Sequence, residues 1–126
     1  GGNTEAGSEL IRDYWATKGI DRNALKIKDG SGLSPQNRVT TKSLVDVLQY
    51  AKKQPWFTAY HDALPLIHNI KMKSGTISGA KGYTGYITNK TGQEFTFALL
   101  VNNYSGPANE VVQNMWQLLD IIVNNK

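Results

Sequence analysis

The chain has 126 residues and a net charge of +4, with two histidines and no cysteine. A chain of this length forms one domain around one core. Without cysteine there is no disulfide, thiolate nucleophile or cysteine-bound zinc. His61 and His68 lack the HExxH spacing, so we expect neither a metal nor another cofactor. No apolar run has membrane-spanning length, and the lysines occur singly or in pairs, so we expect no nucleic-acid partner.

The first part of the chain is predicted to be mostly helical. Residues 8–18 carry apolar side chains at helical spacing, with Ser8 as the N-cap and Gly19 as a left-handed stop. A short strand is expected at residues 25–28. The apolar face of this first helix consists of Leu10, Ile11, Tyr14 and Trp15.

Two further helices are expected after a glycine-rich loop. The second ends at about Lys53 and is capped by Thr40 or Thr41. The third is a short helix at residues 56–63, which Pro55 introduces. The buried side of the second helix is predicted to consist of Leu44, Val45, Leu48 and Ala51.

Three strands and a last helix complete the predicted fold. Alternating apolar and polar residues indicate strands at 67–74, 83–88 and 94–102, joined by short turns. A final helix is expected at residues 109–123, with Asn109 as its cap. We therefore predict an α+β fold, in which helices pack on an antiparallel three-stranded sheet.

The end of the first of these strands, Lys73-Ser74-Gly75-Thr76, offers groups that suit a peptide carboxylate. Alternation places Lys73 on the face opposite Ile70 and Met72, towards solvent or a cleft. A lysine supplies a cation, and a glycine lets a ligand backbone approach the strand edge, where a peptide can add as an extra strand. Taken alone, the same four residues also fit a surface lysine before an ordinary turn.

A second segment, Asp29–Ser34, reads as a loop with two glycines followed by Pro35. By itself it is typical of a structural loop in which Asp and Ser side chains bond to the backbone.

The two segments, in this order, resemble the C-terminal part of D-alanyl-D-alanine carboxypeptidases of the penicillin-binding protein 4 type, which are serine peptidases of bacterial cell-wall metabolism. The KTG motif of that family and the residues after it correspond to residues 73–87 here, with Ser74 in place of the usual threonine. The family's DGSGLSRxN segment corresponds to Asp29, Gly30, Ser31, Gly32, Leu33, Ser34, Pro35, Gln36 and Asn37.

The resemblance implies roles for four residues. Lys73 would bind the terminal carboxylate and support proton movement, and the hydroxyl of Ser74 would meet the same carboxylate. Gly75 would leave room for the substrate. The backbone N–H of Thr76 would be one of two oxyanion-hole donors. In the family a serine is acylated, D-Ala leaves, water releases the acyl group, and β-lactams trap the same serine.

The family's two remaining motifs, Ser-x-x-Lys at a helix start and Ser-x-Asn, are missing from this sequence. The single Ser-x-x-Lys match, Ser78 to Lys81, follows the motif strand in a turn, so we interpret it as coincidence. Lys90-Thr91-Gly92 has the literal Lys-Thr-Gly order but falls in a predicted hairpin turn. The segment that separates the third helix from the Lys73 strand in the family is also shortened here.

Residues 1–126 are therefore expected to form a single domain, the C-terminal portion of a transpeptidase-like carboxypeptidase domain with a partial fold. The parent enzyme would act on peptidoglycan stem peptides ending in D-Ala-D-Ala, in the periplasm or cell envelope, and would bind β-lactams only when intact. We expect this chain alone to be inactive and to self-associate through the exposed sheet edge at residues 95–102. The alternatives are a non-catalytic module that binds peptidoglycan peptides or a protein partner, and a purely structural domain.

Overall fold

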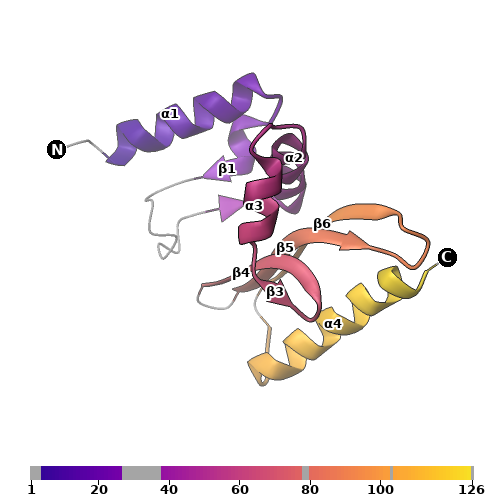
Figure 1. Ribbon diagram of the computed structural model, residues 1–126. Helices are drawn as coiled ribbons and strands as arrows, with labels where there is room; N and C mark the ends of the chain where they lie inside the picture. The colour runs from indigo at the N-terminus through magenta and orange to yellow at the C-terminus, as the bar shows by residue number, and fades with distance from the viewer. Residues whose placement is uncertain (1–3, 27–37, 78–79, 103, 126) are drawn as a thin grey trace.

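The computed structural model describes residues 4–26, 38–77, 80–102 and 104–125. Helices and strands follow the predicted order, with helices first, then strands, then a last helix (Figure 1). The elements are α1 (Thr4–Thr17), η1 (Arg22–Ala24), β1 (Leu25–Lys26), β2 (Arg38–Val39), α2 (Thr41–Lys52), α3 (Phe57–Ala63), β3 (Leu66–Ile67), β4 (Ile70–Ile77), β5 (Ala80–Thr88), β6 (Glu94–Asn102) and α4 (Ala108–Asn124).

The main sheet is antiparallel and has four strands in the order β3-β4-β5-β6, so the predicted number of three is wrong. The strand expected at residues 67–74 is split by a turn at His68 and Asn69. Both residues have positive φ, 48° and 62°, which turns the chain sharply and pairs Ile67 with Ile70. Alternation of apolar residues continues across this turn, and for that reason the sequence pattern conceals it.

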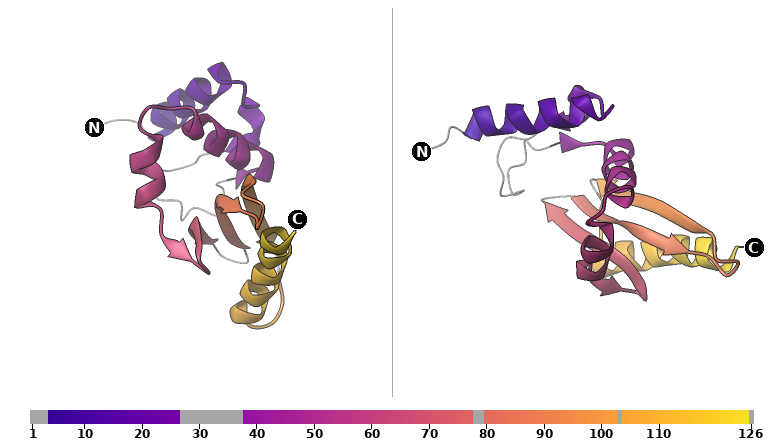
Figure 2. Two further views of the ribbon diagram at one scale, coloured as in Figure 1. Left: turned by 45° about the vertical axis from the view of Figure 1, so that its right-hand side comes forward. Right: turned by 45° about the horizontal axis from the view of Figure 1, so that its top comes forward.

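The first helix differs from its prediction at its start and on its apolar face. It begins at Thr4, so Ser8 lies inside the helix and is buried rather than acting as the N-cap. Gly19 does have the predicted left-handed conformation, with φ at 88°. Leu10 and Tyr14 are exposed, because α1 lies at the end of the molecule away from α4 (Figures 1 and 2).

The larger core lies between one face of the sheet and α4. Met72 and Leu119 are fully buried at its centre, and Met115 is nearly so. The last helix begins at Ala108 after Pro107 rather than at the predicted Asn109 cap. The buried members of this core are Ile70, Met72, Tyr83, Ile87, Phe97, Met115 and Leu119.

A smaller core joins α2 and α3 to the opposite face of the sheet. Leu48 of α2 and Leu64 pack around Tyr86 of β5, with Phe57 edge-on to the Tyr86 ring at 5.2 Å between centroids. The Tyr86 hydroxyl donates a hydrogen bond of 2.7 Å to the Leu48 carbonyl. The predicted cap of α2 is confirmed, since the Thr40 side chain accepts a bond from the Ser43 N–H. This second core holds the helical half of the chain against the sheet.

The turn between β5 and β6 contains Lys90-Thr91-Gly92, as predicted. The side chain of Asn89 accepts bonds from Thr91 and Gln93, and Gly92 has a φ of 84°. These contacts give the literal Lys-Thr-Gly triplet a structural role in the hairpin.

Candidate functional site

The candidate substrate-binding residues lie on β4, within the antiparallel ladder with β5. Lys73 pairs with Thr84, Ser74 with Tyr83, and Gly75 with Gly82. The predicted alternation is observed here, because Met72 is fully buried under α4 while Lys73 is exposed. Lys73 therefore lies on the face of the sheet that α2 and α3 partly cover.

Among the described residues, one side of β4 is a free edge along Ser74 and Thr76. The Met72 N–H points away from β5 and donates a 3.0 Å bond to the Pro65 carbonyl. In a strand the N–H and C=O groups of alternate residues point the same way, so those of Ser74 and Thr76 also point away from β5. β3 pairs only with Ile70 and Lys71, and no other described strand pairs with this side of β4. The edge can therefore accept an added strand.

Gly75 stands at this edge without any packing reason for being glycine among the described residues. A Cβ built on Gly75 meets nothing within 4 Å, whereas one built on its partner Gly82 comes within 2.5 Å of the Leu100 side chain. Gly82 is thus explained by the packing of Leu100. The described residues therefore leave space at Gly75 for a close neighbour such as a ligand backbone.

The ammonium group of Lys73 is bonded to the strand edge itself. Its Nζ donates a hydrogen bond of 2.9 Å to the carbonyl oxygen of Ser74, one of the outward-pointing groups. A cation and a hydroxyl are therefore close to a backbone edge, which is the chemistry that a peptide carboxylate requires.

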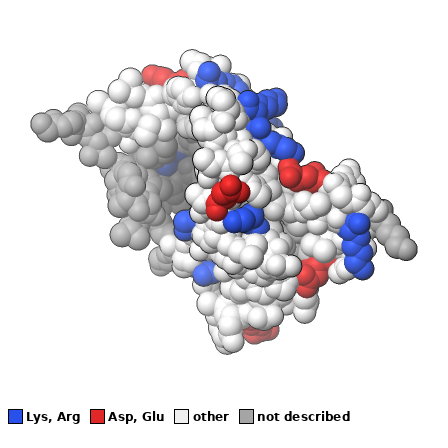
Figure 3. Space-filling model, viewed as in Figure 1, with Lys and Arg blue, Asp and Glu red and all other residues white. Residues whose placement is uncertain are grey.

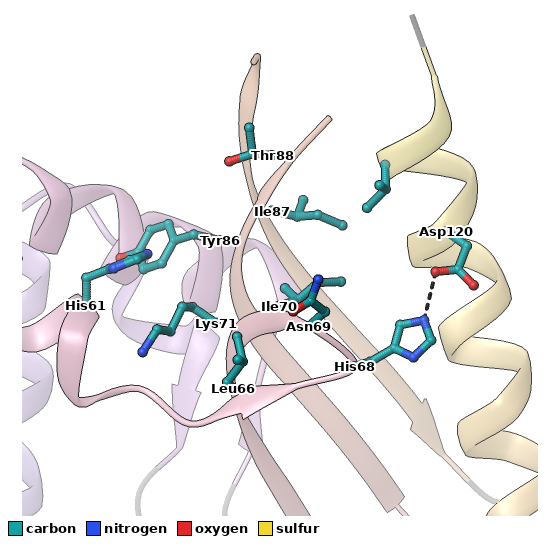
Figure 4. Close-up of a pocket in the computed structure, with 11 residues that line it drawn as sticks. His61, Leu66, His68, Asn69, Ile70, Lys71, Tyr86, Ile87, Thr88 and Asp120 are labelled. Atoms are coloured by element: carbon teal, nitrogen blue, oxygen red, sulfur yellow. Dashed lines mark hydrogen bonds and ion pairs between the residues drawn. The ribbon is translucent and has the colours of Figure 1, made fainter. Parts of the chain in front are cut away.

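A cavity of about 530 Å³ opens at the other end of β4, beyond the candidate substrate edge. His68 reaches from the β3–β4 turn to α4, where its Nε2 lies 2.7 Å from the Asp120 carboxylate (Figure 4). Its ring also stacks on Trp116, with 5.1 Å between the ring centroids. Sequence reasoning missed this contact, because its two polar partners are 52 residues apart. Lys71 also lines the cavity, but its ammonium is engaged by the carbonyls of Asp62 and Leu64.

The remaining surface carries mixed charge. In Figure 3 a group of basic side chains lies over the region of α1 and α2, with acidic groups near it. Several are paired, as in the contact of Lys52 with Glu94 and that of Arg22 with Asp13. Within the described ranges no three His, Cys, Asp or Glu side chains gather as metal ligands, and no helix is long and apolar enough to cross a membrane. The predicted DGSGLS segment, Asp29–Ser34 with Asn37, lies outside the described residues.

Residues 1–123 match the D-Ala-D-Ala carboxypeptidase 3 (S13) family. The chain belongs to this family. Among curated proteins, it is 30% identical to a D-alanyl-D-alanine carboxypeptidase of Actinomadura over 90% of its length, and 27% identical to D-alanyl-D-alanine carboxypeptidase DacB of Haemophilus influenzae over 80%. The chain spans about a quarter of the length of each of these relatives.

Solved structures show that the fold of this S13-family chain is that of a penicillin-binding protein. Penicillin-binding protein 4 of Haemophilus influenzae superposes with a TM-score of 0.83 at 22% identity, over 97% of this chain and 32% of that one. A predatory endopeptidase of Bdellovibrio bacteriovorus, solved with an immunity protein, gives 0.71 at 23% identity, over 99% of this chain and 39% of that one. The predicted partial transpeptidase-like fold is therefore correct, with helices packed on an antiparallel sheet.

Proposed function

We propose that these residues form the C-terminal portion of the catalytic domain of a serine-type D-Ala-D-Ala carboxypeptidase acting on peptidoglycan stem peptides. One observation carries the proposal. In a chain of the S13 family, the Lys73-Ser74-Gly75-Thr76 segment forms a free strand edge, with the cation and the hydroxyl beside it. An extended peptide with a terminal carboxylate is complementary to both features.

Each residue of the segment would have a separate task. Lys73 and Ser74 would bind the carboxylate, and Gly75 would let the peptide backbone approach. The N–H of Thr76, which points outwards by the parity of the strand, would polarise the scissile carbonyl as an oxyanion-hole donor. A reaction on stem peptides would take place in the periplasm or cell envelope of a bacterium, where these peptides are found.

The chain alone should be catalytically silent. It has no Ser-x-x-Lys at a helix start to supply the acylated serine. Removing such a nucleophile lowers turnover by about 10⁶. Incubation with a fluorescent penicillin, followed by a denaturing gel, should show no labelled band. A labelled band would contradict this part of the proposal and would identify a nucleophile that the motifs do not reveal.

A binding module without catalysis is the second candidate. The observation in its favour is that the strand edge is formed here without the missing motifs. Titration with N-acetyl-L-Lys-D-Ala-D-Ala, followed by the backbone amide signals of Ser74 and Thr76, tests the edge directly. Saturable shifts at these two residues support recognition of stem peptides. Their absence at millimolar peptide would contradict the proposed substrate site.

A further inference from the structure

The side chains that oxidants can reach at the surface of this protein are aromatic. The chain has no cysteine, and both of its methionines are buried, Met72 at 0% and Met115 at 2% exposure. Thiol and thioether sulfur, the usual targets of mild oxidants, are therefore absent or enclosed. Tyr14 on α1, by contrast, is 47% exposed. An exposed phenol can give up one electron and one proton to a one-electron oxidant.

Tyr14 meets a second phenol that comes from another helix. Its hydroxyl oxygen lies 2.9 Å from that of Tyr50 on α2, although the two residues are 36 positions apart in the sequence. No other two tyrosine hydroxyls are in contact in the part of the chain that the structure describes. Oxidised tyrosines couple through the ring carbons ortho to their hydroxyls. Because these carbons are next to the hydroxyl-bearing carbons, small rotations of the two rings would bring them into contact.

Neighbouring side chains hold the two phenol rings in this arrangement. Trp15 is edge-on to both, with 5.2 Å between its ring centroid and that of Tyr14 and 5.3 Å to that of Tyr50. The Lys18 ammonium lies 5.5 Å from the centroid of each tyrosine ring, a cation–π contact with both. Holding two reacting groups side by side greatly raises the effective concentration of one at the other.

We propose that Tyr14 and Tyr50 form an oxidative cross-linking site, at which a one-electron oxidant converts the two phenols into a dityrosine bridge between α1 and α2. Two equivalents of oxidant take one electron from each phenol, and each phenol loses its proton to water. The two tyrosyl radicals then form a carbon–carbon bond between ortho positions, and the two ortho hydrogens move to the oxygens and restore the phenols. The product is lighter than the reactant by two hydrogen atoms. The site shares no residue with the β4 edge, so it goes beyond the proposed function and does not depend on it.

A bridge at this position would fasten α1 to the rest of the molecule. In the described residues α1 is also attached to η1 by ion pairs of Glu9 and Asp13 with Arg22. These pairs are partly exposed to solvent, and such pairs contribute little to stability. A covalent link between residues 36 positions apart restricts the unfolded chain. The urea concentration at the midpoint of unfolding should therefore be higher for the cross-linked protein.

The test uses the 126-residue chain, oxidised at micromolar concentration by light-activated tris(bipyridine)ruthenium(II) with persulfate. The monomer should become two hydrogen atoms lighter, and tryptic digestion should yield peptide 13–18 linked to peptide 43–52. Tyr14→Phe and Tyr50→Phe, which retain both rings, should each lower the blue dityrosine fluorescence of the monomer by at least about tenfold. Tyr60→Phe removes a phenol on α3 instead, and as the matched control it should leave this fluorescence unchanged.

Oxidation of the unfolded chain separates the effect of geometry from that of reactivity. In concentrated urea the two phenols lose their contact, so the yield of the linked peptides should fall. Equal yields from the native and the unfolded chain would overturn the inference, because reactivity alone would then select the pair. Bridges that join other tyrosine pairs of the native monomer as often would also overturn it. So would a native chain that is oxidised at Tyr14 without becoming linked to Tyr50.

Discussion

A side chain at position 85 would collide with the backbone of the neighbouring strand. A Cβ built on Gly85 comes within 2.2 Å of the Lys71 carbonyl oxygen and 2.7 Å of the Met72 Cα. Because these are backbone atoms in a paired ladder, they cannot move aside cheaply. The glycine allows β4 and β5 to approach each other where Met72 enters the core.

We expect Gly85→Ala to lower the free energy of unfolding by about 2–4 kcal/mol, as overpacking against backbone atoms does. Gly75→Ala is the matched control on the paired strand. A Cβ there meets nothing within 4 Å, so its effect should stay within about 1 kcal/mol. Urea denaturation followed by circular dichroism measures both. Equal losses in the two variants would contradict the explanation by collision.

Tyr86 links stability to pH. Burial of its ring raises the pKa of the phenol above its ordinary value, and the negative charges of Tyr60 and Glu94 add to the shift. A raised pKa in the folded state means that the folded protein retains the proton when the unfolded chain, with a pKa of about 10, has lost it. The contribution of the protonated Tyr86 phenol to the free energy of unfolding is therefore complete below pH 10 and is progressively lost as the pH rises above 10.

The free energy of unfolding should therefore fall above pH 10, by up to about 1.4 kcal/mol for each pH unit from this one group. Tyr86→Phe should flatten the fall, while lowering stability at neutral pH by about 1 kcal/mol through loss of the bond to the Leu48 carbonyl. Urea unfolding at pH 8, 10 and 11 measures the slope. An unchanged slope in the variant would show that Tyr86 is not the group responsible.

At the scale of elements, the β3–β4 hairpin depends on two residues in the left-handed region. His68 and Asn69 have φ values of 48° and 62°, and the first is held on α4 by Asp120 and Trp116. Asn tolerates this conformation better than most residues, and glycine tolerates it best. The turn is therefore sensitive to the residue type at position 69.

We expect Asn69→Ala to lower the free energy of unfolding by about 1 kcal/mol or more, because a Cβ without a compensating polar group is strained at positive φ. Asn69→Gly should be neutral or slightly stabilising. The pair of variants differs only in that strain, and thermal unfolding compares them. Equal stability of the Asn69→Ala and Asn69→Gly variants would contradict the left-handed turn and the pairing of β3 with β4 that depends on it.

Elements whose own residues determine them could be predicted from the sequence. The Thr40 cap, Gly19 and the Asn89–Gly92 turn each act within a few residues, and β6 agrees with its predicted span. The β3–β4 turn escaped prediction because alternation of apolar residues is preserved through it. The exposure of the α1 face also escaped, because helical spacing shows which side is apolar and does not show what covers it.

The candidate site was predictable only in part. Alternation was enough to place Lys73 opposite Met72, and the four site residues are consecutive on one strand. The free edge at Ser74 follows from the strand order and from the Met72–Pro65 bond, which are tertiary facts. No residue spacing indicates that the Lys73 ammonium bonds to the Ser74 oxygen. The roles of the four residues remain predictions.

At the scale of the whole molecule, the described residues leave the outer edge of β6 without a paired strand and part of the apolar surface of α4 exposed. β6 is the last strand of its sheet, and Leu118 and Ile121 of α4 are 54% and 67% exposed. The backbone N–H of Met72 points away from β5. The N–H and C=O groups of its partner Gly85 therefore point towards β6, and those of Phe97 point back towards β5. The N–H and C=O of Ala98 must then point outwards, to the open edge.

We expect the chain to self-associate through this edge, as unprotected edge strands do. Light scattering on a dilution series should show a mass above that of the monomer at high concentration. Ala98→Pro removes one outward N–H without touching the β5 ladder and should reduce association, whereas Ala98→Val retains the N–H and should not. A monomeric mass at every concentration would contradict the prediction, and equal effects of both variants would assign the contact to another surface.

The division into two cores has a further consequence for how the chain is made. All members of the larger core, buried and partly buried, lie between Ile67 and Val123. During synthesis the N-terminal half leaves the ribosome first. Its helices α2 and α3 must then wait for Tyr86, their partner on β5, and the sheet in turn must wait for α4. Stable packing of the sheet should therefore arise late in translation, and a chain halted before Met115 should remain open to proteases along the strands whose apolar face α4 covers.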